Sequence, residues 1–308
     1  MTLTRREFIV GLGTAAVAPT VARADAGAIR FGYAAITWGG RDLDAIADIA
    51  AAGYPGIQIR SSILRDFVSR PAALAEELAR HKLTLVALSS GNLRIDPAVE
   101  KDDLATHAAN AKFVRDAGGL FLQIIDERPK GRDVTNADCV RLGRLLTELG
   151  RRTSDVGVPL AYHHHMNSIG QPPDAIARIL DAADPRYVKL LLDVAHYQQG
   201  GGDPVRAVKQ YAERIGLLHI KDVEPRPGRS TGSGRQNTPG APDREYRFVE
   251  LGRGTVDLKG VFAALRDVKY RGWAVVELDA VPDNARTPKE AAVANRKYIE
   301  ETIGLAVA

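Results

Sequence analysis

Residues 159–222 read PLAYHHHMNSIGQPPDAIARILDAADPRYVKLLLDVAHYQQGGGDPVRAVKQYAERIGLLHIKD, and this stretch decides the fold. It contains three short apolar runs, at 159–163, 188–193 and 216–220, with polar residues gathered at their C-terminal ends. Two longer segments, 174–183 and 204–214, separate them and have the apolar spacing of amphipathic helices. Short apolar runs of this kind are typical of parallel strands that are buried on both faces. The stretch therefore predicts a repeating strand–helix unit.

The same unit recurs along the chain from residue 29 onward. The expected strands cover residues 29–36, 56–60, 84–89, 120–125, 159–163, 188–193, 216–220 and 273–278. The expected helices cover residues 43–52, 72–81, 104–117, 137–156, 174–183, 204–214, 258–268 and 288–302. Eight such units in about 280 residues match the usual size of a TIM barrel. We therefore predict an α/β protein with a single (β/α)8 barrel domain, residues 25–308.

Helix boundaries and the first loop favour the barrel over a doubly wound open sheet. Glycines follow three of the expected helices, and Asp203-Pro204 and Thr287-Pro288 each supply an N-cap followed by proline at the first helical position. A doubly wound sheet would carry a glycine-rich fingerprint after its first strand. Residues 37–42 read TWGGRD instead, which does not match that fingerprint.

Residues 1–24 resemble a twin-arginine export signal. Arg5 and Arg6 precede a moderately apolar stretch that is too short and too interrupted to span a bilayer, and Ala22-Arg23-Ala24 fits a small-x-small cleavage site. Because the twin-arginine route carries folded proteins, we expect the remaining chain to load its cofactor in the cytoplasm and to work in the periplasm without a membrane anchor.

Composition excludes several other classes of protein. The chain has 308 residues, of which 45% are hydrophobic and 26% charged, as in an ordinary globular protein. Without the leader the net charge falls from +4 to about +2, and no long basic run remains, so we expect no nucleic-acid partner. Cys139 is the one cysteine, so there is no intrachain disulfide, and we expect it to be a small buried residue. The sequence leaves the oligomeric state open, and a homo-oligomer is possible.

A long irregular segment rich in Pro, Gly, Ser and Arg covers about residues 223–247. It follows the seventh expected strand, so in a barrel it would lie over the mouth where barrel enzymes place their active sites. We expect it to act as a lid, with a floppy insertion as the alternative.

The unusual polar residues collect at the C-terminal ends of four expected strands. Strand five ends in the run YHHH at 162–165, and Asp193, His219 and Glu277 end the sixth, seventh and eighth strands. Their spacings of one βα unit, with the long segment added before Glu277, place them at similar heights on adjacent strands. Two imidazoles and two carboxylates that converge on one point suit a divalent metal of mixed N/O preference, Mn²⁺ or Co²⁺ first and Fe²⁺ or Zn²⁺ as alternatives. The predicted ligands are His163, Asp193, His219 and Glu277, with His165 as the alternative on strand five.

These residues resemble the xylose isomerase-like superfamily of sugar isomerases and epimerases, and most closely its inosose dehydratase branch. The resemblance covers about residues 29–303 and is carried by YHHHM (162–166), LLLDVAHY (190–197), LHIKDV (218–223), ELGRGTVDL (250–258) and YRGWAVVELD (270–279). The opening FGYAAITWGG (31–40) is also similar to the first strand of that branch, and we expect its Trp38 to contact substrate.

The resemblance implies roles for individual residues. Most of the superfamily has glutamate as the ligand on strand five, and that position falls on His163 here. His165 matches a substrate-contacting histidine, His196 a residue that contacts substrate hydroxyls, and Lys221 a lysine near the substrate. Gln58 stands on the second strand where glutamate is frequent, which puts an acid–base role on that strand in doubt.

Together these features predict a metal-dependent enzyme that removes a proton next to a metal-bound carbonyl of a sugar or polyol. We expect Lys221, His165 and His196 to be the acid–base groups, and the first of these to have a lowered pKa beside the metal. The intermediate would lose a β-leaving group, as in inosose dehydration or keto-glycoside elimination, or be reprotonated, as in a ketose 3-epimerase. A nuclease of the endonuclease IV type would need more ligands than the chain offers. A non-catalytic exported sugar-binding protein is the alternative of a different class.

Overall fold

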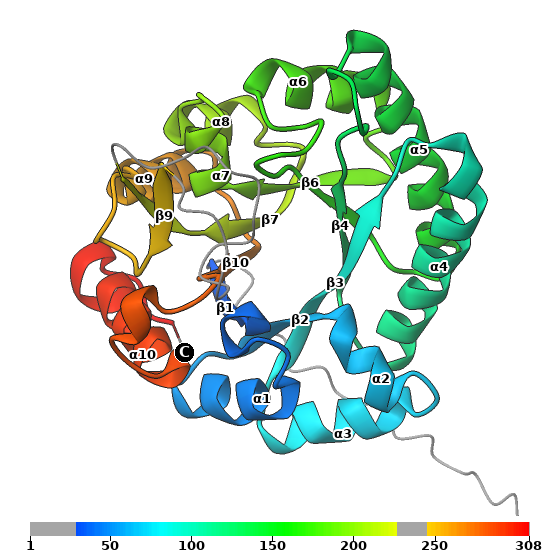
Figure 1. Cartoon of the computed structure of the whole chain (residues 1–308). Helices are drawn as coiled ribbons and strands as arrows, with labels where there is room; N and C mark the ends of the chain where they lie inside the picture. The colour runs from blue at the N-terminus through cyan, green and yellow to red at the C-terminus, as the bar shows by residue number, and fades with distance from the viewer. Residues whose placement is uncertain (1–28, 227–244, 308) are drawn as a thin grey trace, which may run out of the picture.

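Eight parallel strands close into a barrel in the computed structural model, which describes residues 29–226 and 245–307 (Figure 1). The strands follow one another around the barrel in the order β1-β10-β7-β6-β5-β4-β3-β2. Their bounds are β1 Arg30–Ala34, β2 Gly56–Arg60, β3 Thr84–Leu93, β4 Phe121–Asp126, β5 Leu160–His163, β6 Val188–Asp193, β7 Ile215–Ile220 and β10 Trp273–Val276. The prediction of a single (β/α)8 barrel is confirmed.

A ring of helices surrounds the strands (Figure 1). The main helices are α1 Asp42–Ala51, α3 Pro71–Arg80, α4 Pro97–Asp116, α5 Asn136–Asp155, α6 Pro173–Ala182, α8 Pro204–Gln210, α9 Leu258–Asp267 and α10 Pro288–Lys297. The predicted helix signals are present: Gly53, Gly118 and Gly157 have positive φ angles after α1, α4 and α5, and Asp203 and Thr287 cap α8 and α10 with their side chains. No helix among the described residues is long and apolar enough to cross a membrane.

Some predicted boundaries are wrong. The third strand continues to Leu93 through an irregularity in its pairing with β4, and the following helix begins at Pro97, where Asp96 caps it, instead of at residue 104. Helix α8 ends at Gln210, four residues before its predicted end at residue 214. The last helix, predicted to continue to residue 302, changes after Lys297 into the π-helix η4, Tyr298–Ile303. Boundaries depend on caps and on contacts with neighbouring elements, which apolar periodicity does not report.

Several short elements were not predicted from the sequence. They are η1 Ala35–Trp38, η2 Ser61–Ile63, α2 Leu64–Phe67, α7 Val194–Gln199, η3 Pro282–Asn284 and the strands β8 Asp222–Pro225 and β9 Tyr246–Val249. The last two pair as an antiparallel ribbon, so the ends of the segment expected to be irregular are ordered strands. Residues 227–244, which make up most of the predicted lid, and the leader 1–24 lie outside the described residues.

The barrel interior is filled by small and apolar side chains below the strand ends. The interior cluster consists of Ala34, Val86, Ala87, Ala161, Leu191, Leu217, Trp273 and Val275. Side chains two positions apart on a strand share a face. Each predicted ligand therefore has a residue of this cluster two positions before it on the same strand and directly beneath it. These residues are Ala161, Leu191, Leu217 and Val275, beneath His163, Asp193, His219 and Glu277 in that order, so the interior core supports the site from below. A second, larger core lies between strands and helices and includes Cys139, which is buried as predicted.

Trp273 occupies a space that a side chain on β2 would otherwise fill. A Cβ atom built on Gly56 would lie 2.3 Å from Cζ3 of Trp273 and 2.7 Å from Cγ2 of Val86. The close approach of the tryptophan ring to β2 therefore requires glycine at this position.

We predict that Gly56→Ala destabilises the fold by about 1–3 kcal/mol, the usual cost of overpacking a core. The measurement is the free energy of unfolding from urea titration. Trp273→Leu removes the contacting ring atoms, so Gly56→Ala should cost less in that background than in the wild type. Equal costs in both backgrounds would show that the tryptophan contact is not the reason for the glycine.

Candidate metal centre

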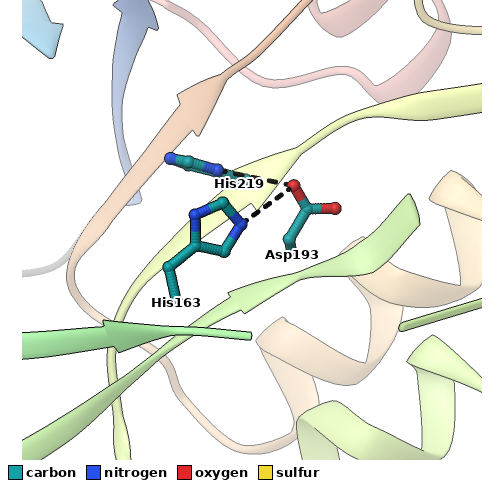
Figure 2. Close-up of side chains that lie close together, drawn as sticks. All are labelled: His163, Asp193 and His219. Atoms are coloured by element: carbon teal, nitrogen blue, oxygen red, sulfur yellow. Dashed lines mark ion pairs between the residues drawn. The ribbon is translucent and has the colours of Figure 1, made fainter. Parts of the chain in front are cut away.

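Three predicted ligands converge at the C-terminal mouth of the barrel. His163 Nε2 lies 3.6 Å from Asp193 Oδ2, and His219 Nδ1 lies 3.4 Å from the same oxygen (Figure 2). One ligand atom from each residue falls within 4.8 Å of the others, and all three side chains are buried. The structure thus brings together His163, Asp193 and His219, with His163 rather than His165 as the contribution of strand five.

The staggered pairing of the strands explains this convergence. Asp193 pairs directly with His219. His163 pairs with Leu191, two residues before Asp193, and Val275 pairs with His219, two residues before Glu277. Strands in a barrel tilt relative to its axis, so a shift of two residues between neighbouring strands keeps side chains level at the mouth.

Asp193 uses its two carboxylate oxygens for different tasks. Oδ1 accepts hydrogen bonds from the backbone N–H groups of Ala195 and His196, at 2.9 and 2.8 Å, and so caps helix α7. Oδ2 faces the imidazoles of His163 and His219. The cap fixes the orientation of the carboxylate. Because α7 begins directly after Asp193, its first turn places His196 beside the site.

The donor atoms that face the centre lack partners. His163 Nε2, Asp193 Oδ2 and His219 Nδ1 are buried and have no hydrogen-bond partner among the described residues. Their separations are too long for hydrogen bonds but suit atoms that share one ion with bonds of about 2.0–2.2 Å. Because a buried polar atom without a partner is costly, a divalent cation bound here would account for all three. The donor set of two imidazoles and a carboxylate fits Mn²⁺, Fe²⁺, Co²⁺ or Zn²⁺.

Glu277, the fourth predicted ligand, lies next to this group. Its Oε2 is 3.5 Å from His219 Nδ1, and its Oε1 accepts a hydrogen bond of 3.0 Å from Lys221 Nζ. Lys221 is fully buried, and it also donates to Asp279 Oδ1 at 2.5 Å. The lysine thus holds one oxygen of Glu277 and leaves the other oriented toward His219.

Burial and neighbouring charges set the protonation states of these groups. Burial, with a smaller effect from His219, lowers the pKa of His163 to about 4. Burial raises the pKa of Asp193, but neighbouring groups, His196 first, outweigh it and hold that pKa well below its usual value. The imidazole is therefore neutral and the carboxylate ionised, as metal ligands must be.

The protein's own groups shift the pKa of Lys221 upward, and the lowered pKa expected beside a metal stays a prediction. Burial does lower the pKa of its ammonium group, but the carboxylates of Asp279 and Glu277 outweigh burial and raise the pKa above the ordinary value for lysine. A lysine paired with two carboxylates is a hydrogen-bond donor and not a free base.

The other two predicted catalytic residues lie beside the centre. The rings of His165 and His196 are 3.8 Å apart between centroids, and His196 Nε2 is 3.9 Å from Asp193 Oδ2. His165 Nδ1 lies 2.7 Å from the carbonyl oxygen of Met166, and the N–H of Met166 donates to His196 Nδ1 at 3.4 Å. His165 is partly exposed while His196 is buried, so His165 is the more accessible of the two.

His164 and Trp38 point to other parts of the structure. His164 Nε2 accepts a hydrogen bond from the backbone N–H of Asp193, so it lies on the opposite face from its two neighbours, as the alternation along a strand predicts. Trp38 is buried after β1, and its indole N–H donates to Asp48 of helix α1 at 2.9 Å. The substrate contact expected of Trp38 remains a prediction, and its indole N–H is already bonded within the protein.

Three residues at the site were not assigned a role from the sequence. The ring of Phe248, on β9, lies 3.8 Å from Lys221 Nζ and packs edge-on against His196. Gln58 and Gln123 lie inside the barrel and contact His219 and His163. A glutamine in an otherwise apolar strand was a usable signal for both, whereas nothing in the sequence indicated that Phe248 would fold back onto the site.

The chain is similar to known proteins in sequence and in fold. The chain is 29% identical over 301 residues to an inosose dehydratase of Lacticaseibacillus casei, a match that covers 90% of this chain and 98% of that protein. The fold resembles the IOLI protein with a bound zinc atom, at a TM-score of 0.73 and 19% identity over 90% of this chain and 98% of that one. It also resembles a probable 3-DHS dehydratase, AsbF, from Bacillus anthracis, at a TM-score of 0.68 and 15% identity over 88% and 98% of the two chains.

The family profile described as xylose isomerase-like TIM barrel matches residues 46–302. That range runs from within α1 to within η4 and contains every predicted ligand. The chain belongs to the xylose isomerase-like TIM barrel family.

Proposed function

We propose that the chain is a metal-dependent lyase that removes water, or another β-leaving group, from a keto-sugar or keto-polyol. The observation that carries this proposal is the set of three buried, unpartnered donor atoms on His163, Asp193 and His219, with two further imidazoles beside it. The inosose dehydratases among its relatives favour dehydration over other outcomes.

The chain's own residues define how a cation would be held. His163 Nε2, Asp193 Oδ2 and His219 Nδ1 are the ligand atoms, and Glu277 Oε2 is the proposed fourth. Mn²⁺ or Co²⁺ is our first expectation, with Fe²⁺ or Zn²⁺ as alternatives. When bound, the cation would supply a Lewis acid that polarises the keto group and makes the neighbouring C–H more acidic.

Met166 gives the two catalytic histidines opposite tautomers. Its carbonyl oxygen can only accept, so His165 carries its proton on Nδ1 and has a free lone pair on Nε2. Its N–H can only donate, so neutral His196 accepts at Nδ1 and carries its proton on Nε2. His165 Nε2 is therefore suited to be the base, and His196 Nε2 to donate a hydrogen bond to the leaving group.

These tautomers support a balanced elimination. His165 Nε2 takes the proton from the carbon next to the keto group, and the electron pair of that C–H bond forms the C=C bond. The C–O bond to the β-substituent breaks at the same stage. The leaving oxygen accepts a hydrogen bond from His196 Nε2 and takes the proton that His165 Nε2 received, so both imidazoles end neutral. With a hydroxyl as leaving group, the products are an unsaturated ketone and water. Lys221 Nζ, held by two carboxylates, would donate a hydrogen bond to a substrate oxygen.

Two other outcomes use the same residues. If the carbon is reprotonated in place of losing a substituent, the enzyme is a ketose 3-epimerase or a sugar isomerase. A sugar-binding protein without catalysis would not need the metal.

A keto-glycoside would suit an exported enzyme, because such oxidised glycosides need no phosphorylation to be substrates.

We predict that Asp193→Asn abolishes stoichiometric metal binding. Asparagine still caps a helix, so α7 should persist while the negative ligand is lost. The measurement is metal content by elemental mass spectrometry, with about one equivalent of a transition metal expected in the wild type and none in the variant. Asp203→Asn is the matched control, because Asp203 caps α8 in the same way without facing the site. A wild-type chain that takes up no added Mn²⁺, Co²⁺ or Zn²⁺ would contradict the metal centre.

We predict that the metal-loaded chain converts inosose or a 3-keto-glycoside into an unsaturated product with loss of the β-substituent. His165→Gln should lower kcat about 10²–10⁴-fold with unchanged metal content, since it removes the base but no proposed ligand. His81→Gln, which changes a histidine outside the site, should have no effect. Mass spectrometry of products formed in D₂O separates the outcomes. A product that has taken up deuterium but has kept its β-substituent would indicate an epimerase or isomerase. No reaction would favour the sugar-binding alternative.

We also propose that residues 1–24 direct export of the folded chain to the periplasm. Residues 1–28 fused to a folded fluorescent reporter should send it to the periplasm of a bacterium with a twin-arginine translocase. Replacing both Arg5 and Arg6 with lysine should keep the reporter in the cytoplasm, as measured by cell fractionation. Export of the double variant at the wild-type level would contradict the proposed signal.

A further inference from the structure

Two buried glutamines lie behind the imidazole ligands. Gln58 on β2 and Gln123 on β4 are each only 2% exposed, inside a barrel whose other interior residues are mostly apolar. Gln58 Oε1 lies 3.0 Å from His219 Nε2, and Gln123 Nε2 lies 3.0 Å from His163 Nδ1. Each amide thus contacts the ring nitrogen that faces away from the metal centre.

Ser89 on β3 joins the two amides. Gln58 Nε2 donates to Ser89 Oγ at 3.4 Å, and the Ser89 hydroxyl donates to Gln123 Oε1. The result is a continuous bridge from His219 through Gln58, Ser89 and Gln123 to His163. β7 and β2 are not neighbours in the barrel, so the first contact crosses the interior, and the later ones step along adjacent strands.

The bridge matters because a histidine ligand must offer an unprotonated nitrogen to the ion. Its proton then sits on the other ring nitrogen, which needs an acceptor. Gln58 Oε1 can only accept, so its contact places the proton of His219 on Nε2 and leaves Nδ1 free, as ligation requires. This contact fixes both the orientation and the tautomer of one ligand.

His163 needs the same arrangement at its Nδ1. In the described structure the Gln123 amide donates to Nδ1, which leaves the proton of His163 on Nε2. A half-turn of the amide would present Oε1 to Nδ1–H and free Nε2 for the ion. Ser89 can support both orientations, since a hydroxyl either donates or accepts.

We propose that Gln58, Ser89 and Gln123 are positioning residues that set the tautomers of His219 and His163 and thereby determine metal affinity, although none of them lies among the ligands. The proposal rests on the proposed function only in assuming that the centre binds a divalent cation. It also gives a reason for three buried polar side chains in the barrel interior, where apolar residues would otherwise pack without the cost of burying amides.

The test measures Zn²⁺ affinity of metal-free protein by competition with a chromophoric chelator. Gln58→Leu and Gln123→Leu should each weaken binding about 10–100-fold, the usual effect of losing a partner of a ligand. Because the two amides are joined, the double variant should lose less than the product of the single effects. Asn110→Leu is the matched control: it removes a buried amide that bonds Ser90, outside the bridge, and should leave the affinity unchanged.

Two conservative variants separate positioning from packing. Gln58→Glu keeps an acceptor for His219 Nε2–H, so its affinity should equal or exceed that of the wild type. Ser89→Ala leaves both amides but removes their link, and should weaken binding several-fold and make the two leucine effects independent. If the leucine variants do not fold, the Zn²⁺ affinity of Ser89→Ala still tests the proposal. The absorption spectrum of the Co²⁺-loaded proteins should change in the leucine variants and not in Gln58→Glu.

The outcomes distinguish this proposal from the proposed function. If the wild type binds no Zn²⁺ or Co²⁺, the metal centre itself is wrong. If the wild type binds and all the bridge variants bind equally well, the metal centre stands and the bridge proposal is overturned. Equal losses in Gln58→Glu and Gln58→Leu would overturn it as well, because they would show that only the packing of glutamine matters.

Discussion

The burial of the Asp193 carboxylate is the constraint on which the rest of the site depends. An ionised carboxylate inside a barrel is costly unless both oxygens have partners. One oxygen caps α7, and the other faces the imidazoles of His163, His219 and His196 at 3.4–3.9 Å. A divalent cation would give the second oxygen a partner, and the strands on either side would supply its remaining donors. The same cap determines where α7 begins and hence where His196 lies.

Hydrogen bonds hold the site in place on two sides of this carboxylate. On one side the ammonium of Lys221 holds Glu277 and Asp279 and lies under the ring of Phe248, which connects the β8–β9 ribbon to the centre. On the other side two glutamines contact the outer nitrogens of the imidazole ligands. These partners leave each ligand little freedom to rotate, so the geometry at the mouth is largely set before any ion or substrate arrives.

The sequence alone determined the class of fold and the polar residues that meet at its mouth. Apolar strands buried on both faces, separated by amphipathic helices, have few solutions other than a barrel at this length, and polar residues at strand ends must then meet at one mouth. For this reason His163, Asp193 and His219 could be chosen before the structure was known, and the alternation along strand five separated His164 from its neighbours.

Only the tertiary structure decided the contacts between distant segments. The choice of His163 over His165 follows from the two-residue stagger between neighbouring strands, and register is a property of the closed sheet rather than of any one segment. The raised pKa of Lys221 depends on two carboxylates more than fifty positions away. The contact of Gln58 with His219 crosses the barrel interior. Local patterns report which residues are buried or polar, but not which of them meet, because that depends on how the chain closes on itself.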